Sequence, residues 1–302
     1  MANDTSKLGF SPALGSSVMV TEKDLHLGRG RTLHYYDTCE DASDDRTPVF
    51  WMHGTPNLGS PPEPLFQAAA ERGLRWVSYD RPGYGGSSPQ PGRDVAAAAA
   101  DVAGIADAIG ARQFAVFGHS GGGPHALACG ALLPGRVTAV VSASAPAPHG
   151  APGLDWFAGW TGYGTGEQRA AAAGRAVLAQ YLASAEFDAD SFIPADEEAL
   201  GGRWAWLGGV AGAAMEQGPD AMIDDLLASA RPWGFDLAGI TVPVLIMHGA
   251  ADRMVPPSHA DWLAANCSSA ELRIVPGAGH ITVLDSAPAA LGWLCEGTER
   301  GR

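Results

Sequence analysis

The chain has 302 residues, of which 46% are hydrophobic and 17% charged, a composition that allows one large α/β core with an inserted segment. Its formal net charge of −14 opposes nucleic acid or an anionic membrane surface as a partner, because both are themselves negatively charged. The four cysteines are widely separated, without the spacing of a zinc site or a disulfide framework, so we expect reduced thiols.

The first 20 residues contain one Lys and no continuous apolar run, unlike a secretory signal. No later stretch reaches the roughly 18 uncharged apolar residues that a membrane-spanning helix needs. We therefore expect a cytoplasmic protein that does not bind membranes, with residues 1–17 as a flexible N-terminal arm.

From residue 18, short apolar runs alternate with Ala-rich stretches, which predicts a mostly parallel sheet covered by helices. Runs at about 18–27 and 31–38 flank Gly28 to Gly30 and predict an antiparallel hairpin at the sheet edge. The later strands are predicted over residues 47–53, 74–80, 113–119, 137–143, 242–248 and 271–275. The helices of this part are predicted over residues 61–72, 94–109, 122–133, 257–266 and 283–294.

The strand rhythm is absent between residues 146 and 236, where short helical stretches are broken by Gly and Pro. We interpret this segment as a helical cap inserted in a core formed by residues 18–145 and 237–302. It is rich in tryptophan, and four of these side chains are candidates to line an apolar substrate pocket: Trp156, Trp160, Trp204 and Trp206. The alternative is that these tryptophans pack the cap helices together.

Gly118 to Gly122 has the sequence GHSGG and matches G-x-S-x-G, in which small residues allow a sharp turn that exposes the serine hydroxyl. The pattern alone is weak in a chain with 40 glycines. Its context is stronger, because an apolar strand precedes Ser120 and a helix is predicted directly after it. Ser120 is therefore the candidate nucleophile.

A serine hydroxyl needs a base to take its proton and a carboxylate to orient that base. His280 follows the last predicted strand in a Gly-rich turn, and Asp252 follows the strand before it, so both should reach the same sheet edge as Ser120. His119 is a poorer candidate base, because its position directly before Ser120 predicts that it points away. A loop histidine and an exposed loop aspartate are the structural alternatives for His280 and Asp252.

The attacked carbonyl oxygen becomes negatively charged and needs backbone N–H donors aimed at it. Gly121, directly after the nucleophile, can supply one donor. The second is expected from the loop that follows the strand at 47–53. Thr55 is the preferred donor there, because Pro56 has no N–H.

The motifs are, in chain order, His53-Gly54-Thr55-Pro56, Asp80 to Ser87 (DRPGYGGS), Gly118 to Gly122, Asp252 and His280. In this order the chain resembles the α/β-hydrolase superfamily over about residues 30–296. The resemblance implies an eight-stranded, mostly parallel sheet with helices on both faces and a helical cap after the sixth strand. Serine in the turn favours the serine esterase-like branch over haloalkane dehalogenases and epoxide hydrolases, which place aspartate there. The HGTP segment also differs from the HGGPG motif of proline iminopeptidases.

The expected function is hydrolysis of a carboxylic ester, lactone or thioester of a hydrophobic small molecule through an acyl-enzyme on Ser120. No metal and no organic cofactor is expected. One alternative is another reaction on the same three residues, such as carbon-carbon bond hydrolysis, a lyase reaction or a cofactor-free oxygenation. The other is a receptor that uses the pocket for recognition only. The sequence predicts no particular oligomeric state.

Overall fold

A computed structural model describes residues 18–39, 44–186 and 188–300, so the expected N-terminal arm at 1–17 lies outside the described residues. Eight strands form one sheet in the order β1-β2-β4-β3-β5-β6-β7-β8. Their bounds are β1 Thr21–His26, β2 Thr32–Asp37, β3 Thr47–Met52, β4 Leu74–Tyr79, β5 Phe114–His119, β6 Val137–Ala143, β7 Val244–Gly249 and β8 Ala270–Val275. The hairpin pair β1–β2 and the pair β2–β4 are antiparallel, and all other neighbours are parallel. The predicted mixed, mostly parallel sheet is confirmed.

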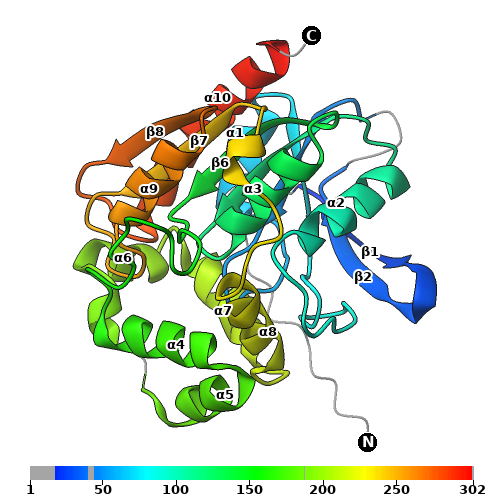
Figure 1. Cartoon of the computed structure of the whole chain (residues 1–302). Coiled ribbons are helices and arrows are strands. Elements are labelled where there is room, and N and C mark those ends of the chain that lie inside the picture. The colour runs from blue at the N-terminus through cyan, green and yellow to red at the C-terminus, as the bar shows by residue number, and fades with distance from the viewer. Residues whose placement is uncertain (1–17, 40–43, 187, 301–302) are drawn as a thin grey trace, which may run out of the picture.

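Helices cover both faces of this sheet, because the side chains of its central strands alternate between two apolar clusters (Figure 1). On β3, Phe50 and Met52 pack on the face covered by α2 (Ala97–Ala108), α3 (Gly122–Leu132) and α9 (Ser258–Asn266). Val49 and Trp51 pack on the other face, under α1 (Phe66–Ala70) and α10 (Ala287–Arg300). Within the described residues no helix is both long and apolar enough to cross a membrane.

Two predicted helices begin as 3-10 turns and become α-helical later than expected. The helix expected over 61–72 begins as a 3-10 turn, Glu63–Leu65, with Pro64 in its first turn, and becomes α-helical only at Phe66. The helix expected from residue 283 is likewise a 3-10 turn, Thr282–Ser286, before α10 begins at Ala287. Pro288 then occupies the first turn of α10, where a missing N–H is tolerated.

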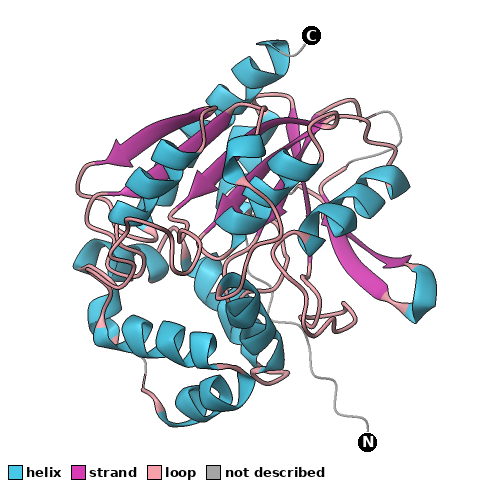
Figure 2. Cartoon of the chain, viewed as in Figure 1, coloured by secondary structure: helices cyan, strands magenta, loops and turns pink. Residues whose placement is uncertain are grey.

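Between β6 and β7 the structure contains helices, as predicted, and we call residues 146–236 the cap segment. Its α-helices are α4 Gly162–Ala173, α5 Arg175–Ser184, α6 Pro194–Leu200, α7 Ala205–Met215 and α8 Asp220–Ser229. They gather below the sheet in Figure 1, with α4 and α5 farthest from it, and Figure 2 shows no strand among the described residues of this segment. The division into a core domain and a cap domain stays a prediction.

Candidate active site

Ser120 lies in a sharp turn between β5 and α3. Its φ of 55° falls in the left-handed region, which is uncommon for a residue with a side chain. Two glycines make room for the turn: a Cβ on Gly118 would lie 2.4 Å from the carbonyl oxygen of Gly122, and a Cβ on Gly122 would lie 1.9 Å from that of Met52. The turn therefore has the strand-turn-helix geometry that presents a nucleophile at the carboxyl edge of the sheet.

The structure brings the three predicted residues of the triad together. His280 follows β8, and its Nε2 lies 2.9 Å from Oγ of Ser120. Asp252 follows β7, and its Oδ2 lies 2.9 Å from Nδ1 of the same imidazole. This chain of two hydrogen bonds is the arrangement in which a histidine can take the proton of a serine hydroxyl while a carboxylate orients the ring.

The charges of this pair support such a transfer. Burial alone would lower the pKa of His280, but the adjacent carboxylate of Asp252 raises it above its ordinary value. Burial alone would raise the pKa of Asp252, yet the imidazoles of His280 and His248 hold it below its ordinary value. Asp252 is therefore ionised, and His280 is a stronger base than a free imidazole.

Two further histidines hold the triad in place, and the sequence interpretation missed both. Nε2 of His248 donates to the carbonyl oxygen of Val255 at 2.8 Å and lies 3.3 Å from Oδ2 of Asp252. His119 packs against the ring of His280, and its Nε2 donates to the backbone carbonyl of that residue at 2.9 Å. The prediction that His119 points away from the site was wrong, because this hydrogen bond turns its ring toward the loop after β8.

The two predicted oxyanion donors lie side by side. A Cβ on Gly121 would lie 3.5 Å from the backbone nitrogen of Thr55 and 2.6 Å from its Oγ1. Among the described residues, no hydrogen-bond acceptor is found for the backbone N–H of Thr55 or of Gly121. Thr55 lines the cavity beside Ser120, and Gly121 directly follows Ser120 in the chain. Both N–H groups are therefore candidates to bind a developing oxyanion.

A buried charge cluster lies behind Thr55. Arg81, Arg93 and Asp225 are each at most 6% exposed, and both guanidinium groups contact the Asp225 carboxylate. Nη2 of Arg81 also donates to the carbonyl oxygen of Gly54 at 2.8 Å. The Thr55 hydroxyl donates to Oδ2 of Asp225 at 2.8 Å. Asp225 belongs to α8, so the cap segment contacts the oxyanion loop directly.

A second carboxylate of the cap segment holds the loop of His280. Asp196 on α6 is fully buried, and its Oδ2 accepts a hydrogen bond from the backbone N–H of His280 at 2.9 Å. Its Oδ1 accepts bonds from the backbone N–H groups of Ile281 and Thr282 and from the Thr282 hydroxyl, at 2.8–3.0 Å. The position of the base therefore depends on a side chain from the cap segment.

A cavity of about 270 Å³ opens beside Ser120. The core borders it with the HGTP turn, Ser120 and His280, and α6 and α7 border it from the cap segment. Its apolar lining consists of Pro56, Phe192, Leu200, Leu207, Ala211, Met254 and Ile281. Ligand cavities usually measure roughly 300–1,000 Å³, so this one suits a small apolar group.

None of the four predicted pocket tryptophans lines this cavity, so that prediction was wrong. Trp156 and Trp160 stack on each other with ring centroids 5.0 Å apart and pack against His259. Trp204 is fully buried, and its Nε1 donates to Asp285 at 2.9 Å. Trp206 packs edge-on against a tryptophan of β3. These rings pack the cap segment together or join it to the core.

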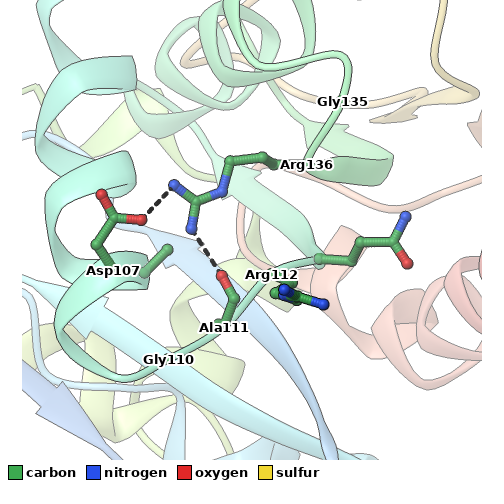
Figure 3. A pocket seen from close by; sticks show the side chains of 8 residues that line it. Asp107, Gly110, Ala111, Arg112, Gly135 and Arg136 are labelled. Carbon is green, nitrogen blue, oxygen red and sulfur yellow. Dashed lines mark hydrogen bonds and ion pairs between the residues drawn. The ribbon is translucent and has the colours of Figure 1, made fainter.

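A larger and more open hollow of about 700 Å³ lies at the opposite edge of the sheet, where β5 and β6 begin (Figure 3). Arg136 crosses it and bonds Asp107 and the carbonyl oxygen of Ala111, each at 2.7 Å. This hollow lacks a nucleophile and is separated from Ser120 by the length of a strand. In the part of the chain that the structure describes, no group of three or more His, Cys, Asp or Glu residues could hold a metal ion.

An eight-stranded sheet with a Ser-His-Asp triad at its carboxyl edge defines an α/β hydrolase. The chain belongs to the alpha/beta hydrolase fold family, whose model matches residues 47–287. It is 33% identical over 255 residues to a non-heme chloroperoxidase of Streptomyces lividans, covering 78% of this chain and 86% of that protein.

Solved structures share this fold. An esterase of Exiguobacterium antarcticum superposes with a TM-score of 0.67 at 20% identity, covering 92% of this chain and 100% of that one. An enol-lactonase of Burkholderia xenovorans superposes with a TM-score of 0.64 at 19% identity, with the same coverage.

Proposed function

We propose that this chain is a serine hydrolase that cleaves a carboxylic ester or lactone with a small apolar acyl group. The observation on which this rests is the 2.9 Å contact between Oγ of Ser120 and Nε2 of His280 at the wall of an apolar cavity. Acyl transfer needs an activated nucleophile, an oriented base and oxyanion donors within reach of one carbonyl group. Ser120, His280, Asp252, Thr55 and Gly121 supply these three functions.

In the first half of the reaction, Nε2 of His280 takes the proton of the Ser120 hydroxyl as Oγ bonds to the ester carbon. The carbonyl oxygen becomes an oxyanion and accepts hydrogen bonds from the N–H groups of Thr55 and Gly121. The carbon-oxygen bond to the alcohol then breaks, and His280 gives its proton to the leaving oxygen. The products of this half are a free alcohol and an ester of Ser120.

In the second half, His280 takes a proton from a water molecule whose oxygen attacks the acyl carbon. The bond to Oγ breaks, Ser120 regains the proton from His280, and the carboxylic acid leaves. Asp252 stays ionised throughout and stabilises the imidazolium in both halves.

The test is hydrolysis of p-nitrophenyl acetate and butyrate, together with labelling by a fluorophosphonate and mass spectrometry of the labelled peptide. We expect both esters to be cleaved, one label to be found on Ser120, and Ser120→Ala to lose both properties. Ser144→Ala is the matched control, because Ser144 also has a positive φ at the end of a neighbouring strand but no histidine bond. An unlabelled Ser120 in folded protein that cleaves neither ester contradicts the proposal.

The name of the Streptomyces lividans relative favours a second candidate, the formation of a peroxy acid. Hydrogen peroxide can replace water in the second half, so that its oxygen attacks the acyl carbon and Ser120 leaves. The resulting peroxy acid oxidises a halide ion to hypohalous acid and returns to the carboxylic acid. Bromination of a dye by acetate, peroxide and bromide that requires Ser120 would support this candidate, and its absence in an active esterase would reject it.

A further inference from the structure

A buried arginine holds the turn that supplies the oxyanion donor Thr55. Arg81 donates to the carbonyl oxygens of both His53 and Gly54, and its own backbone N–H donates to Nε2 of His53 at 3.1 Å. Arg81 is 1% exposed, so these bonds form in a region of low dielectric constant, where they are stronger than in water. The backbone of the HGTP turn is therefore fixed relative to one guanidinium group.

The bond from Arg81 to Gly54 has a further effect. The carbonyl group of Gly54 and the N–H of Thr55 belong to the same peptide unit. A cation that donates to the carbonyl end draws electron density through the peptide and makes its N–H a better donor, since hydrogen bonds in a chain polarise one another. This peptide joins Gly54 and Thr55, which both line the cavity beside Ser120.

Asp225 fixes Arg81 and the turn at the same time. Its Oδ2 lies 2.5 Å from Nη2 of Arg81 and accepts the Thr55 hydroxyl at 2.8 Å, while that hydroxyl lies 3.0 Å from the same Nη2. Asp225, Arg81 and Thr55 Oγ1 thus form a closed triangle of contacts. Arg93 adds a second cation to Asp225, so the cluster of two guanidiniums and one carboxylate has an excess positive charge next to the site of the oxyanion.

Two histidines near this cluster leave that charge unchanged. Burial, and then the nearby Arg81, lower the pKa of His53 well below its ordinary value. The same two causes lower the pKa of His125 to about 3. Both rings are therefore neutral at physiological pH. Asp225 stays ionised, because the two guanidiniums outweigh the effect of its burial and lower its pKa.

We propose that Asp225, a residue of the cap segment, is a positioning residue for hydrolysis: it aims the N–H of Thr55 at the oxyanion through Arg81 and the Thr55 hydroxyl. The inference rests on the proposed function, because it assigns a partner to the oxyanion donor of that reaction. It makes the cap segment a component of the catalytic machinery, in addition to a wall of the cavity.

The test compares Thr55→Val with Thr55→Ser. Val keeps the backbone N–H and the branched Cβ but lacks the hydroxyl that bonds Asp225, whereas Ser keeps the hydroxyl and lacks the methyl group. Removing an oxyanion donor outright costs about 10²–10³ in kcat, so misaiming one should cost less. We expect Thr55→Val to lower kcat about tenfold with little change in KM, and Thr55→Ser to stay within about threefold of the wild type.

A boronic acid that forms a tetrahedral adduct with Ser120 gives a readout that a general loss of structure would not reproduce. Its affinity should fall in Thr55→Val by the same factor as kcat, while the affinity for the product alcohol stays unchanged. Asp225→Asn should behave in the same way. Asp224→Asn is its matched control, because Asp224 is the neighbouring residue of α8 and is also buried, but it pairs with Arg175 of the cap segment instead.

The outcomes separate the two proposals. If the wild type neither cleaves esters nor reacts with the fluorophosphonate, the proposed function fails, and the role of Asp225 in that reaction fails with it. If the wild type is active and Thr55→Val matches Thr55→Ser in kcat and boronic acid affinity, the role of Asp225 is refuted. Should Asp225→Asn fail to fold, as judged by its melting temperature, the Thr55 pair still decides, because neither Thr55 variant removes a charge.

Discussion

Asp252 is fixed through both of its carboxylate oxygens. Oδ1 accepts hydrogen bonds from the backbone N–H groups of Met254 and Val255, both at 2.9 Å. Oδ2 bonds His280 and lies 3.3 Å from Nε2 of His248. A carboxylate restrained in this way holds the imidazole in one orientation before substrate binds, which is what preorganised catalysis requires.

Replacing Asp252 by Asn tests this residue. Asn can still accept the two backbone bonds through Oδ1, so the fold should persist, but its amide cannot stabilise the imidazolium of His280. We expect kcat to fall by a large factor, on the order of 10⁴ as for the aspartate of serine proteases. Asp261→Asn, an equal change of charge at an exposed position of α9, should leave the rate unchanged.

Asp252→Asn should also shift the pH dependence of kcat/KM. His280 works as a base only when neutral, so kcat/KM falls as the pH drops through its pKa. In the wild type Asp252 raises that pKa, which places the acid limb above the ordinary histidine value of about 6.5. In Asp252→Asn burial acts without the carboxylate, and the limb should move to lower pH. An unmoved limb in the pH profile of kcat/KM would show that another group sets it.

At the scale of elements, the loop after β8 packs closely against helix α6. Gly279 is needed there because a Cβ would lie 2.0 Å from Oδ2 of Asp196, the side chain that accepts the His280 N–H. Gly277, two residues earlier, has a φ of 72° but open space at its Cβ. One glycine is therefore required by a contact with the cap segment and the other by backbone conformation alone.

Gly277 and Gly279 should respond differently to replacement by alanine. Gly277→Ala should lower the free energy of unfolding by roughly 1 kcal/mol, the cost of left-handed backbone for Ala, and leave kcat/KM almost unchanged. Gly279→Ala should displace Asp196 or His280 and reduce kcat/KM at least tenfold. Ester hydrolysis and urea unfolding of both variants check this. In an Asp196→Ala background the effect of Gly279→Ala should shrink, since the clash is removed, and full additivity would argue against the contact.

The sequence predicted the elements of the core better than the contacts of the cap segment. A buried strand such as Val137–Ala143 is marked by its own apolar run, and Ser120 by its glycines and its place after a strand. Asp196 and Asp225 carry no such local sign. They contact residues 84 and 144 positions away, and the acidic residues beside them in α6 and α8 face solvent or other partners.

The contacts of the tryptophans in the cap segment could not be predicted from the sequence either. An aromatic residue in a helical stretch is equally suited to a pocket wall and to helix packing, and only the orientation of the helix decides between them. The residues that do line the cavity from this segment include small ones, such as Gly208 and Ala211, which no pattern in the sequence distinguishes.

On the scale of the whole molecule, the cavity belongs to the core and the cap segment together. The core supplies the reacting groups at the carboxyl ends of parallel strands, the usual position for a site in an open α/β sheet. Helices α6 and α7 close the apolar side, and Asp196 and Asp225 attach the same segment to the base and to the oxyanion loop. Changes in cap helices should therefore alter substrate choice where they face the cavity and the catalytic rate where they bear these carboxylates.

The influence of cavity-facing cap residues on substrate choice can be tested at Gly208. It lies on α7 at the cavity, and a Cβ there would meet no atom within 4 Å, so the leucine side chain of Gly208→Leu can start toward the cavity without a clash at its Cβ. We expect it to reduce kcat/KM for p-nitrophenyl octanoate at least tenfold relative to the acetate. Gly209→Leu is the matched control, because its Cβ is equally free but does not line the cavity.

Both variants should gain up to about 1 kcal/mol of unfolding free energy by replacing a helical glycine, so a difference between their chain-length profiles reflects the cavity alone. Identical profiles would mean that the acyl group binds elsewhere.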